Sequence, residues 1–162
     1  MKVAKKFHWE AAHRLPWHEG DCKNLHGHSY RMIVELEGEP DERGMLMDFK
    51  ILKRILMPLI DQWDHATMIA ESDAQLLDLI RQTGWKHVVL PADTTSENLC
   101  RFVSDYLIAE AGDELKKHRV KAVRTRIFET ETSYAELETR VDGQSEADPF
   151  VGAEARAHSS IR

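Results

Sequence analysis

The sequence is poor in cysteine and contains no long apolar run. Its 162 residues include two cysteines, Cys22 and Cys100, which are too few to predict a disulfide framework, so both are expected to be free thiols. No stretch approaches the roughly 20 consecutive apolar residues of a membrane-spanning helix. The start of the chain also lacks the apolar core of a signal peptide. We therefore expect a cytoplasmic protein without a membrane partner.

Positive charge is outweighed by negative charge. Lys and Arg total 22 against 28 Asp and Glu, so the formal net charge is −6, and this balance argues against a nucleic-acid partner. It also means that an anionic substrate would need local cations, for which Arg14, Lys23 and Arg31 are candidates. Hydrophobic residues make up 42% of the chain, which is enough for one globular domain with its own core.

The most informative stretch is 22–28, with the sequence Cys-Lys-Asn-Leu-His-Gly-His. Side chains two residues apart in a strand point to the same side, so the imidazoles of His26 and His28 can reach one ion. With His13 upstream, three neutral imidazoles would leave one position open on Zn²⁺, as in catalytic zinc sites. The thiol of Cys22 adds a candidate acid or base. The alternative is a structural role, with two strand histidines hydrogen-bonded at a sheet edge.

Alternation of apolar and polar residues predicts two amphipathic strands early in the chain. One covers residues 2–10 and the other covers 29–37, and in each the apolar side chains share one parity. His26 and His28 fall on the apolar parity of the second strand. A metal held there would lie on the covered face of the sheet, where electrostatic interactions are stronger because water is partly excluded.

Two helices are predicted from their caps and from helical spacing of apolar residues. Asp48 is a good N-cap for the first, in which Pro58 causes a kink or an early end. Residues 94–97, Thr-Thr-Ser-Glu, form a capping box with Thr94 as the cap of the second. Gly112 and a charged turn follow that helix.

Two further strands are predicted over residues 120–129 and 134–140. Together these elements predict an α+β fold, a four-stranded antiparallel sheet with two helices on one face. Residues 66–93 contain a predicted short helix over 74–81 and an apolar strand-like run, Val88-Val89-Leu90, but no catalytic pattern. They are not assigned to the sheet.

The end of the chain differs in composition from the rest. From Asp142 onward large apolar residues are scarce, so the segment cannot bury enough surface to offset the entropy cost of ordering it. We therefore predict one domain over residues 1–141 and a flexible tail over 142–162.

Asp64 and His65 place a carboxylate directly beside an imidazole. Adjacent side chains do not usually bond to each other, so an acid/base pair and a polar helix exit are equally good interpretations. Cys100 lies inside the second predicted helix with no base nearby in sequence. It is expected to be a packing residue rather than a nucleophile.

In combination, these motifs resemble the 6-pyruvoyl tetrahydropterin synthase / 6-carboxytetrahydropterin synthase family over roughly residues 3–140. Each motif alone is weak, but all of them occur in the family's order. They are Ala11-Ala12-His13-Arg14-Leu15, Cys22 ahead of Leu25-His26-Gly27-His28, Met47-Asp48-Phe49, Asp64-His65, Thr95-Ser96-Glu97-Asn98-Leu99 and Phe128-Glu129-Thr130.

The resemblance implies a zinc enzyme that acts on a pterin. The implied zinc ligands are His13, His26 and His28. The implied catalytic residues are Cys22, as the thiol, with Asp64 and His65 as its acid/base partners. The implied substrate-binding residues are Glu129, as the pterin anchor, with Thr95 and Ser96 lining the pocket. Glu97 would line it too, or only cap its helix.

The spacing inside the cysteine motif is similar to that of one branch of the family. Three residues separate Cys22 from His26, as in bacterial enzymes that make 6-carboxy-5,6,7,8-tetrahydropterin for 7-deazaguanine and queuosine synthesis, whereas the animal pyruvoyl enzymes have a wider gap. The implied substrate is 7,8-dihydroneopterin triphosphate, and the implied products are the carboxypterin, acetaldehyde and triphosphate. The alternatives are a 6-pyruvoyl tetrahydropterin synthase, a metal-dependent hydrolase, and a noncatalytic zinc- or pterin-binding protein.

The resemblance also implies a tunnelling fold and an oligomer. Family members form trimeric barrels that stack into homohexamers, with each active site at a subunit boundary. Cys22 and the Asp64–His65 pair would then meet from neighbouring chains. The stretch 68–93 looks longer than in compact members of the family.

Overall fold

The computed structural model describes residues 1–141, so the predicted flexible tail over 142–162 lies outside the described residues. The elements in chain order are β1 (Lys2–His13), a 3₁₀ turn η1 (Asp21–Lys23), β2 (His26–Gly38), α1 (Phe49–Trp63), β3 (Ala66–Ala70), α2 (Ala74–Thr83), β4 (His87–Leu90), α3 (Ser96–Lys117), β5 (Val120–Phe128) and β6 (Tyr134–Arg140).

The strands form one six-stranded mixed sheet in the order β4-β3-β1-β2-β5-β6. β1, β2, β5 and β6 pair antiparallel with their neighbours, as predicted. The prediction of a sheet with only four strands was wrong, because β3 and β4 extend the sheet in parallel beyond β1. The short helix predicted over 74–81 is confirmed as α2, which connects these two strands. All five residues of β3 are buried, so this strand lacks the alternation by which half-buried strands are found.

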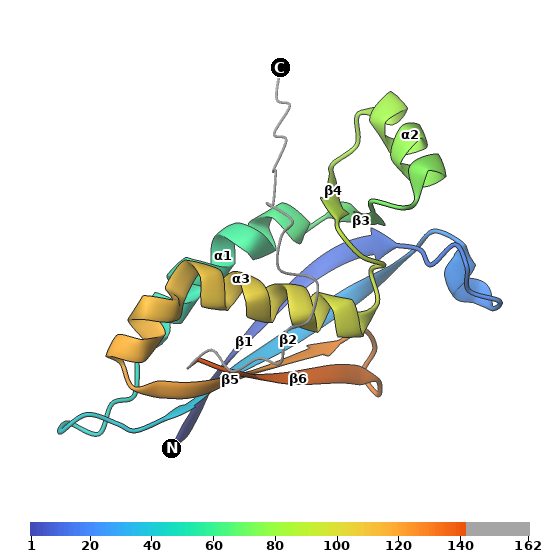
Figure 1. The fold of residues 1–162 in the computed structure, drawn as a ribbon. Helices are drawn as coiled ribbons and strands as arrows, with labels where there is room; N and C mark the ends of the chain where they lie inside the picture. Colours follow the sequence, from blue (N-terminus) through green and yellow to red (C-terminus); the bar gives the residue numbers. More distant parts are fainter. Residues whose placement is uncertain (142–162) are drawn as a thin grey trace.

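Helices α1 and α3 lie along the same face of the sheet (Figure 1). α1 covers β1, while α3 covers β5 and β6. The short helix α2 projects near the β3–β4 end of the molecule (Figure 1). The buried parities of β1 and β2 meet these helices in one core, whose largest fully buried side chains include Trp9, Tyr30 and Trp63.

The starts of the two long helices follow side-chain caps. Asp48 accepts the Lys50 backbone N–H at 2.8 Å, as predicted, and α1 continues through Pro58 to Trp63. The cap predicted for α3 was wrong by one residue, because Thr95 and not Thr94 accepts the Asn98 N–H, at 3.3 Å. The predicted turn at Gly112 was also wrong, since α3 continues through that residue to Lys117.

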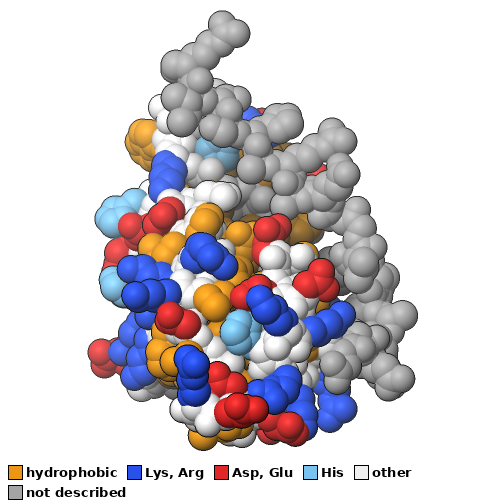
Figure 2. Space-filling view, turned by 90° about the vertical axis from the view of Figure 1, so that its left-hand side faces the viewer, with side chains coloured by type: hydrophobic (Ala, Val, Ile, Leu, Met, Phe, Trp, Pro, Cys, Tyr) orange, Lys and Arg blue, Asp and Glu red, His pale blue; other side chains and the backbone are white. Residues whose placement is uncertain are grey.

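The surface carries charges of both signs. Figure 2 shows Lys and Arg side chains interspersed with Asp and Glu across one face, without a continuous basic field. On the strands, Arg124 pairs with Glu35 at 2.9 Å and with Glu138. Cross-strand pairs of opposite charge stabilise neighbouring strands. Among residues 1–141, no helix is both long enough and apolar enough to cross a membrane.

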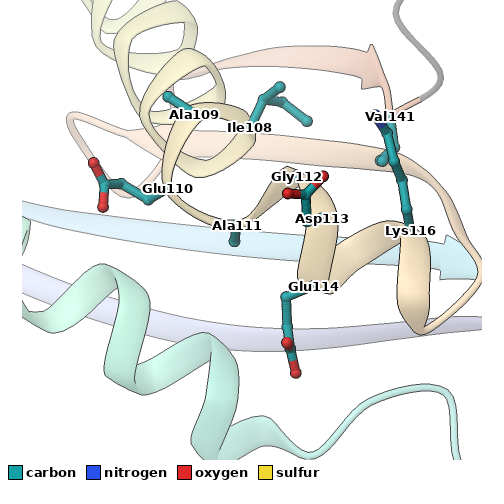
Figure 3. A pocket seen from close by; sticks show the side chains of 9 residues that line it. All are labelled: Ile108, Ala109, Glu110, Ala111, Gly112, Asp113, Glu114, Lys116 and Val141. Carbon is teal, nitrogen blue, oxygen red and sulfur yellow. The ribbon is translucent and has the colours of Figure 1, made fainter.

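A hollow of about 410 Å³ lies along the C-terminal half of α3, next to Val141. The carboxylates of Glu110, Asp113 and Glu114 point in different directions around it (Figure 3). Its lining contains no histidine or cysteine and none of the predicted site residues. It therefore offers no convergent chemistry, and the candidate site lies elsewhere.

Candidate metal centre and active site

The pairing of β1 with β2 brings three histidines together at one end of the sheet. In this antiparallel register His13 is opposite His26, and Ala11 is opposite His28. Because strand side chains alternate between faces, all three imidazoles lie on the face that also carries Trp9 and Tyr30. The alternation of side chains that buries the apolar residues therefore also places the three histidines on one face.

The three imidazoles are close enough to share one ion. Their ring centroids are 4.6 Å apart for His13 and His26, 5.2 Å for His13 and His28, and 4.8 Å for His26 and His28. One ring nitrogen from each lies within 4.8 Å of the other two. His13 is buried, and the other two are half-buried. The predicted ligand set therefore converges in the folded chain.

Hydrogen bonds select the nitrogen that faces the centre. Nδ1 of His13 is 3.0 Å from the Thr94 carbonyl oxygen and 3.1 Å from the Thr94 hydroxyl. Nδ1 of His26 is 2.8 Å from the Asn24 carbonyl oxygen. A carbonyl oxygen only accepts, so Nδ1 carries the proton in both rings and Nε2 keeps a free lone pair. Such second contacts orient metal-binding histidines.

Two ring nitrogens of the triad are buried without a hydrogen-bond partner. Among residues 1–141, the buried side-chain nitrogen and oxygen atoms without a hydrogen-bond partner are Nε2 of His13, Nε2 of His28, Nε1 of Trp9 and the hydroxyl of Tyr30. Buried polar atoms rarely stay unpaired. Imidazole nitrogen suits zinc and other borderline divalent ions, so the donor set fits the predicted metal.

Burial keeps His13 and His28 in the form that binds a metal. Desolvation lowers the pKa of His13 to about 4, and the nearby His26 and His28 lower it further, against the opposing effect of the Thr94 carbonyl. Desolvation is also the main cause that lowers the pKa of His28. Neutral imidazole is the metal-binding state, so these two rings need not lose a proton near neutral pH.

Glu129 directly follows β5 and reaches the same centre. The register that pairs Arg31 with Phe128 places Glu129 beside Tyr30. Its Oε1 is 3.3 Å from Nε2 of His13 and 3.7 Å from Nε2 of His28. Desolvation and the Glu129 charge both raise the pKa of Tyr30, so the phenol stays protonated beside the carboxylate.

Cys22 lies in η1, in the loop that joins β1 to β2, and is half-buried. Its carbonyl oxygen accepts the Leu15 backbone N–H at 2.8 Å. This bond holds the cysteine loop against the chain that leaves His13. Cys100 is buried in α3, where desolvation raises its pKa to about 11, in agreement with its predicted packing role.

Asp64 and His65 do bond to each other, contrary to the expectation for adjacent side chains. His65 has a positive φ of 58°, which turns its ring so that Nδ1 lies 2.9 Å from Oδ2 of Asp64. The other carboxylate oxygen accepts the Glu10 N–H at 2.9 Å. This bond and the His65 contact lower the pKa of Asp64.

The Asp64–His65 pair is separate from the triad within one chain. The His65 side chain is 75% exposed. In the described part of the chain, the contacts of the pair lead to Glu10 and Lys86 and not to the three histidines. The His65 imidazole therefore lies on the surface of the chain.

Thr95 and Ser96 lie at the N-terminus of α3. Thr95 is half-buried and uses its hydroxyl as the helix cap, while Ser96 is buried and Glu97 is exposed. Trp17 in the cysteine loop donates its indole N–H to Asp93 at 2.9 Å. This bond links the loop after β1 to the segment that leads into α3.

Two contacts of the site were not predicted from the sequence. Thr94 was expected to cap α3, but it is fully buried against His13. Arg14, a candidate cation for an anionic substrate, instead forms a two-pronged ion pair with Asp73 at 2.7 Å for both bonds. The run of three hydroxyl residues at 94–96 was the available signal for Thr94, whereas no local pattern joins Arg14 to Asp73.

Comparison with known protein families identifies the chain. Residues 2–140 match the family described as 6-pyruvoyl tetrahydropterin synthase. The chain belongs to this family. The match covers most of the chain, and it confirms the resemblance seen in the motifs.

Several relatives within the 6-pyruvoyl tetrahydropterin synthase family carry a more specific name. A protein of Haemophilus influenzae named 6-carboxy-5,6,7,8-tetrahydropterin synthase is 33% identical over 148 residues, covering 85% of this chain and 99% of that protein. One of Aquifex aeolicus with the same name is 31% identical over 157 residues, covering 83% of this chain and 96% of that protein.

Solved structures of the family share the fold. That of Plasmodium falciparum 6-pyruvoyl tetrahydropterin synthase superposes with a TM-score of 0.70 at 18% identity, covering 86% of this chain and 98% of that chain. The Caenorhabditis elegans enzyme gives a TM-score of 0.61 at 23% identity, covering 86% and 95%. These similarities establish the family's tunnelling fold for the six-stranded sheet described above.

Proposed function

We propose that this chain is a zinc-dependent 6-carboxy-5,6,7,8-tetrahydropterin synthase. It would convert 7,8-dihydroneopterin triphosphate to the carboxypterin with release of acetaldehyde and triphosphate, a step of 7-deazaguanine and queuosine synthesis. The observation that carries the proposal is the triad itself, three imidazoles converging on one point with two buried Nε2 atoms unpaired. The names of the two bacterial relatives support the choice of product.

The three histidines would hold the metal through Nε2. His13 and His26 are already oriented for this by the carbonyl oxygens at their Nδ1 atoms. A bound zinc ion would supply Lewis-acid polarisation, which makes the hydroxyl groups of the substrate side chain more acidic. The covered face of the sheet strengthens electrostatic interactions by limiting water.

Cys22 would move protons at the side-chain carbons of the substrate. A thiol near a cationic centre has more thiolate character than a free thiol, and thiolate is the form that acts as a base. The bond from Leu15 to the Cys22 carbonyl holds the thiol's loop beside the strand that carries His13. Cys22 is thus a catalytic residue in this proposal and not a metal ligand.

Glu129 would anchor the ring. Its two carboxylate oxygens can accept two hydrogen bonds from the amino and N–H edge of a pterin, which is planar two-point recognition. Fixing the ring in this way places the reacting side chain relative to the triad. Thr95 and Ser96, at the start of α3, would line the ring pocket.

The Asp64–His65 pair would serve the site of a neighbouring chain. Its imidazole is exposed and makes no contact with the triad of its own chain among the described residues. Asp64 fixes the ring through Nδ1, so Nε2 is free to take or give a proton. A homohexamer built as a dimer of trimers would bring this group to the cysteine and triad of a partner copy.

A second candidate is a 6-pyruvoyl tetrahydropterin synthase, which the family description favours. Both reactions begin with the same substrate and lose triphosphate, so the product decides between them. Mass spectrometry after incubation with 7,8-dihydroneopterin triphosphate should detect 6-carboxy-5,6,7,8-tetrahydropterin together with acetaldehyde. A 6-pyruvoyl product without acetaldehyde would select the second candidate, and unconverted substrate would favour a noncatalytic binding protein.

A further inference from the structure

Trp17 is a large apolar side chain that is 59% exposed in the loop between β1 and β2. Its indole N–H nevertheless has a fixed partner, because it donates to Oδ2 of Asp93 at 2.9 Å. Asp93 directly precedes Thr94, whose carbonyl oxygen and hydroxyl contact His13. The bond therefore joins the loop that carries Cys22 to the segment that orients one histidine of the triad.

The loop is tied together by its own backbone, so the position of Trp17 affects that of Cys22. Leu15 donates its N–H to the Cys22 carbonyl oxygen at 2.8 Å, and its own carbonyl oxygen accepts the His18 N–H at 2.9 Å. The Leu15 side chain is buried. Trp17 lies between these bonded residues in the chain, so a displacement of Trp17 also displaces the turn that holds the thiol.

The acceptor of the indole bond is held firmly by other contacts. The Asp93 carbonyl oxygen accepts the side-chain N–H of Asn98, in the first turn of α3, at 2.9 Å. Thr94, the next residue, is fully buried. By contrast, among residues 1–141 the Trp17–Asp93 bond is the only hydrogen bond that links residues 16–24 to a part of the chain beyond the β1–β2 hairpin. The placement of the loop relative to the triad therefore depends on this bond.

We propose that Trp17 is a positioning residue for Cys22, which it holds beside the histidine triad through the bond to Asp93. The inference rests on the proposed function, in which the Cys22 thiol moves protons on the substrate. A thiol with that task must lie within hydrogen-bond reach of the proton it transfers, and a displacement of about 1 Å can lower a rate strongly. Because the bond is exposed to water, it is weak enough for the loop to open for a substrate and close again.

Three variants separate the bond from the ring and from the charge. Trp17→Phe keeps an aromatic ring and removes the N–H donor. Asp93→Leu removes the acceptor together with a negative charge, whereas Asp93→Asn removes the charge and keeps an acceptor oxygen. Trp85→Phe is the matched control, because it makes the same substitution at an exposed tryptophan just before β4.

The first measurement is the rate at which iodoacetamide alkylates Cys22, followed by mass spectrometry at equal zinc content. The Cys22→Ala chain gives the background from Cys100, which is buried in α3. Loss of one hydrogen bond of ordinary strength should raise the rate about 2- to 10-fold in Trp17→Phe and in Asp93→Leu. The double variant should be no faster than either, because both substitutions remove the same bond. Asp93→Asn and Trp85→Phe should match the wild type.

The second measurement separates kcat from KM with 7,8-dihydroneopterin triphosphate as the substrate. A displaced thiol slows the chemical step, so Trp17→Phe and Asp93→Leu should lower kcat about 10-fold and leave KM within about 2-fold of the wild type. Asp93→Asn should restore kcat. A raised KM at unchanged kcat would overturn the positioning role, because it would mean that the indole contacts the substrate itself.

The remaining failures point to different errors. Equal alkylation rates in Trp17→Phe and the wild type would overturn the inference, whether or not the chain converts the substrate. Faster alkylation with unchanged kcat would overturn the role of Trp17 in catalysis and leave the proposed function intact. A wild type without turnover would overturn the proposed function and the catalytic part of this inference, while the alkylation rates would still decide whether the bond holds the loop.

Discussion

Removing the carboxylate of Asp73 is expected to destabilise the chain through an ion pair next to the histidine triad. Arg14, the residue after His13, donates from Nε and Nη2 to the two Asp73 oxygens, each at 2.7 Å. Asp73 is 6% exposed and caps α2 by accepting the Leu76 N–H at 3.2 Å. The pair therefore joins α2 to the end of β1.

The expected cost of Asp73→Ala follows from these contacts. Breaking a buried ion pair by removing one partner costs about 3–5 kcal/mol, and losing a helix cap costs about 1 kcal/mol. The Arg14 side chain is 18% exposed and keeps a bond to Gln75 at 3.1 Å, so the remaining charge stays partly solvated. We therefore expect a loss of about 3 kcal/mol in the free energy of unfolding.

Urea unfolding at a fixed chain concentration measures this loss, since stability of an oligomer depends on concentration. The control is Asp78→Ala, which removes an exposed carboxylate from the same helix and should cost less than about 0.5 kcal/mol. A loss below about 1 kcal/mol for Asp73→Ala at pH 7 would refute the reasoning, because that is the range of solvated surface pairs.

The loss of stability in Asp73→Ala is expected to become smaller as the pH falls. The Arg14 bond is the main cause that lowers the pKa of Asp73 from its usual value of 3.8. A carboxyl group with a lowered pKa in the folded state stabilises the fold above its unfolded-state pKa, and this contribution disappears as the pH falls through the folded-state pKa. The difference between the wild type and Asp73→Ala should therefore be constant near pH 7 and shrink below about pH 4.

Three further predictions concern the site. Cys22→Ala should keep its zinc by elemental analysis and lose turnover, because the thiol is proposed as an acid/base and not a ligand; near-normal turnover would favour the hydrolase or binding alternatives. Thr94→Val should weaken zinc binding roughly 10-fold, because it removes the hydroxyl that contacts His13. This is the low end of the loss expected for a group that orients a ligand, since the Thr94 carbonyl remains. Unchanged zinc affinity would show that the hydroxyl does not support His13. Cys22→Ala chains refolded together with His65→Ala chains should regain activity at about a quarter of the sites if neighbouring chains share each site; a mixed oligomer as inactive as both parents would exclude sharing.

The position of the triad on the covered face was predictable because the strand period is two. His26 and His28 follow the parity of Tyr30 and Met32, and that parity is buried in the structure. The pairing of His13 with His26 was not predictable in the same way. Strand register depends on contacts between segments that are distant in sequence. Only the family resemblance indicated that His13 joins His26 and His28.

The two strands missing from the predicted sheet show the limit of local patterns. β3 is buried on both faces and β4 has four residues, so neither displays the alternation of a half-buried strand. Their parallel pairing also needs α2 as a crossover, which brings together segments distant in sequence. The short helix and the apolar run were visible in the sequence, but their place in the sheet was not.

Two features of the site depend on geometry that residue types do not specify. The Asp64–His65 contact requires a left-handed backbone at His65, which is uncommon for residues other than glycine. The approach of Glu129 to His13 requires β5 to lie beside β2 in the observed register. A motif names such residues, whereas the distances between them come only from the fold.

Zinc content per chain is the measurement that tests the central claim most directly. The wild type, purified and then exposed to zinc with the excess removed, should hold one zinc ion per chain by elemental analysis. The His26→Ala chain, treated in the same way, should hold essentially none, because two imidazoles retain the ion too weakly. No zinc in the wild type, or an equal amount in the two proteins, would contradict the assignment of His13, His26 and His28 as the metal centre.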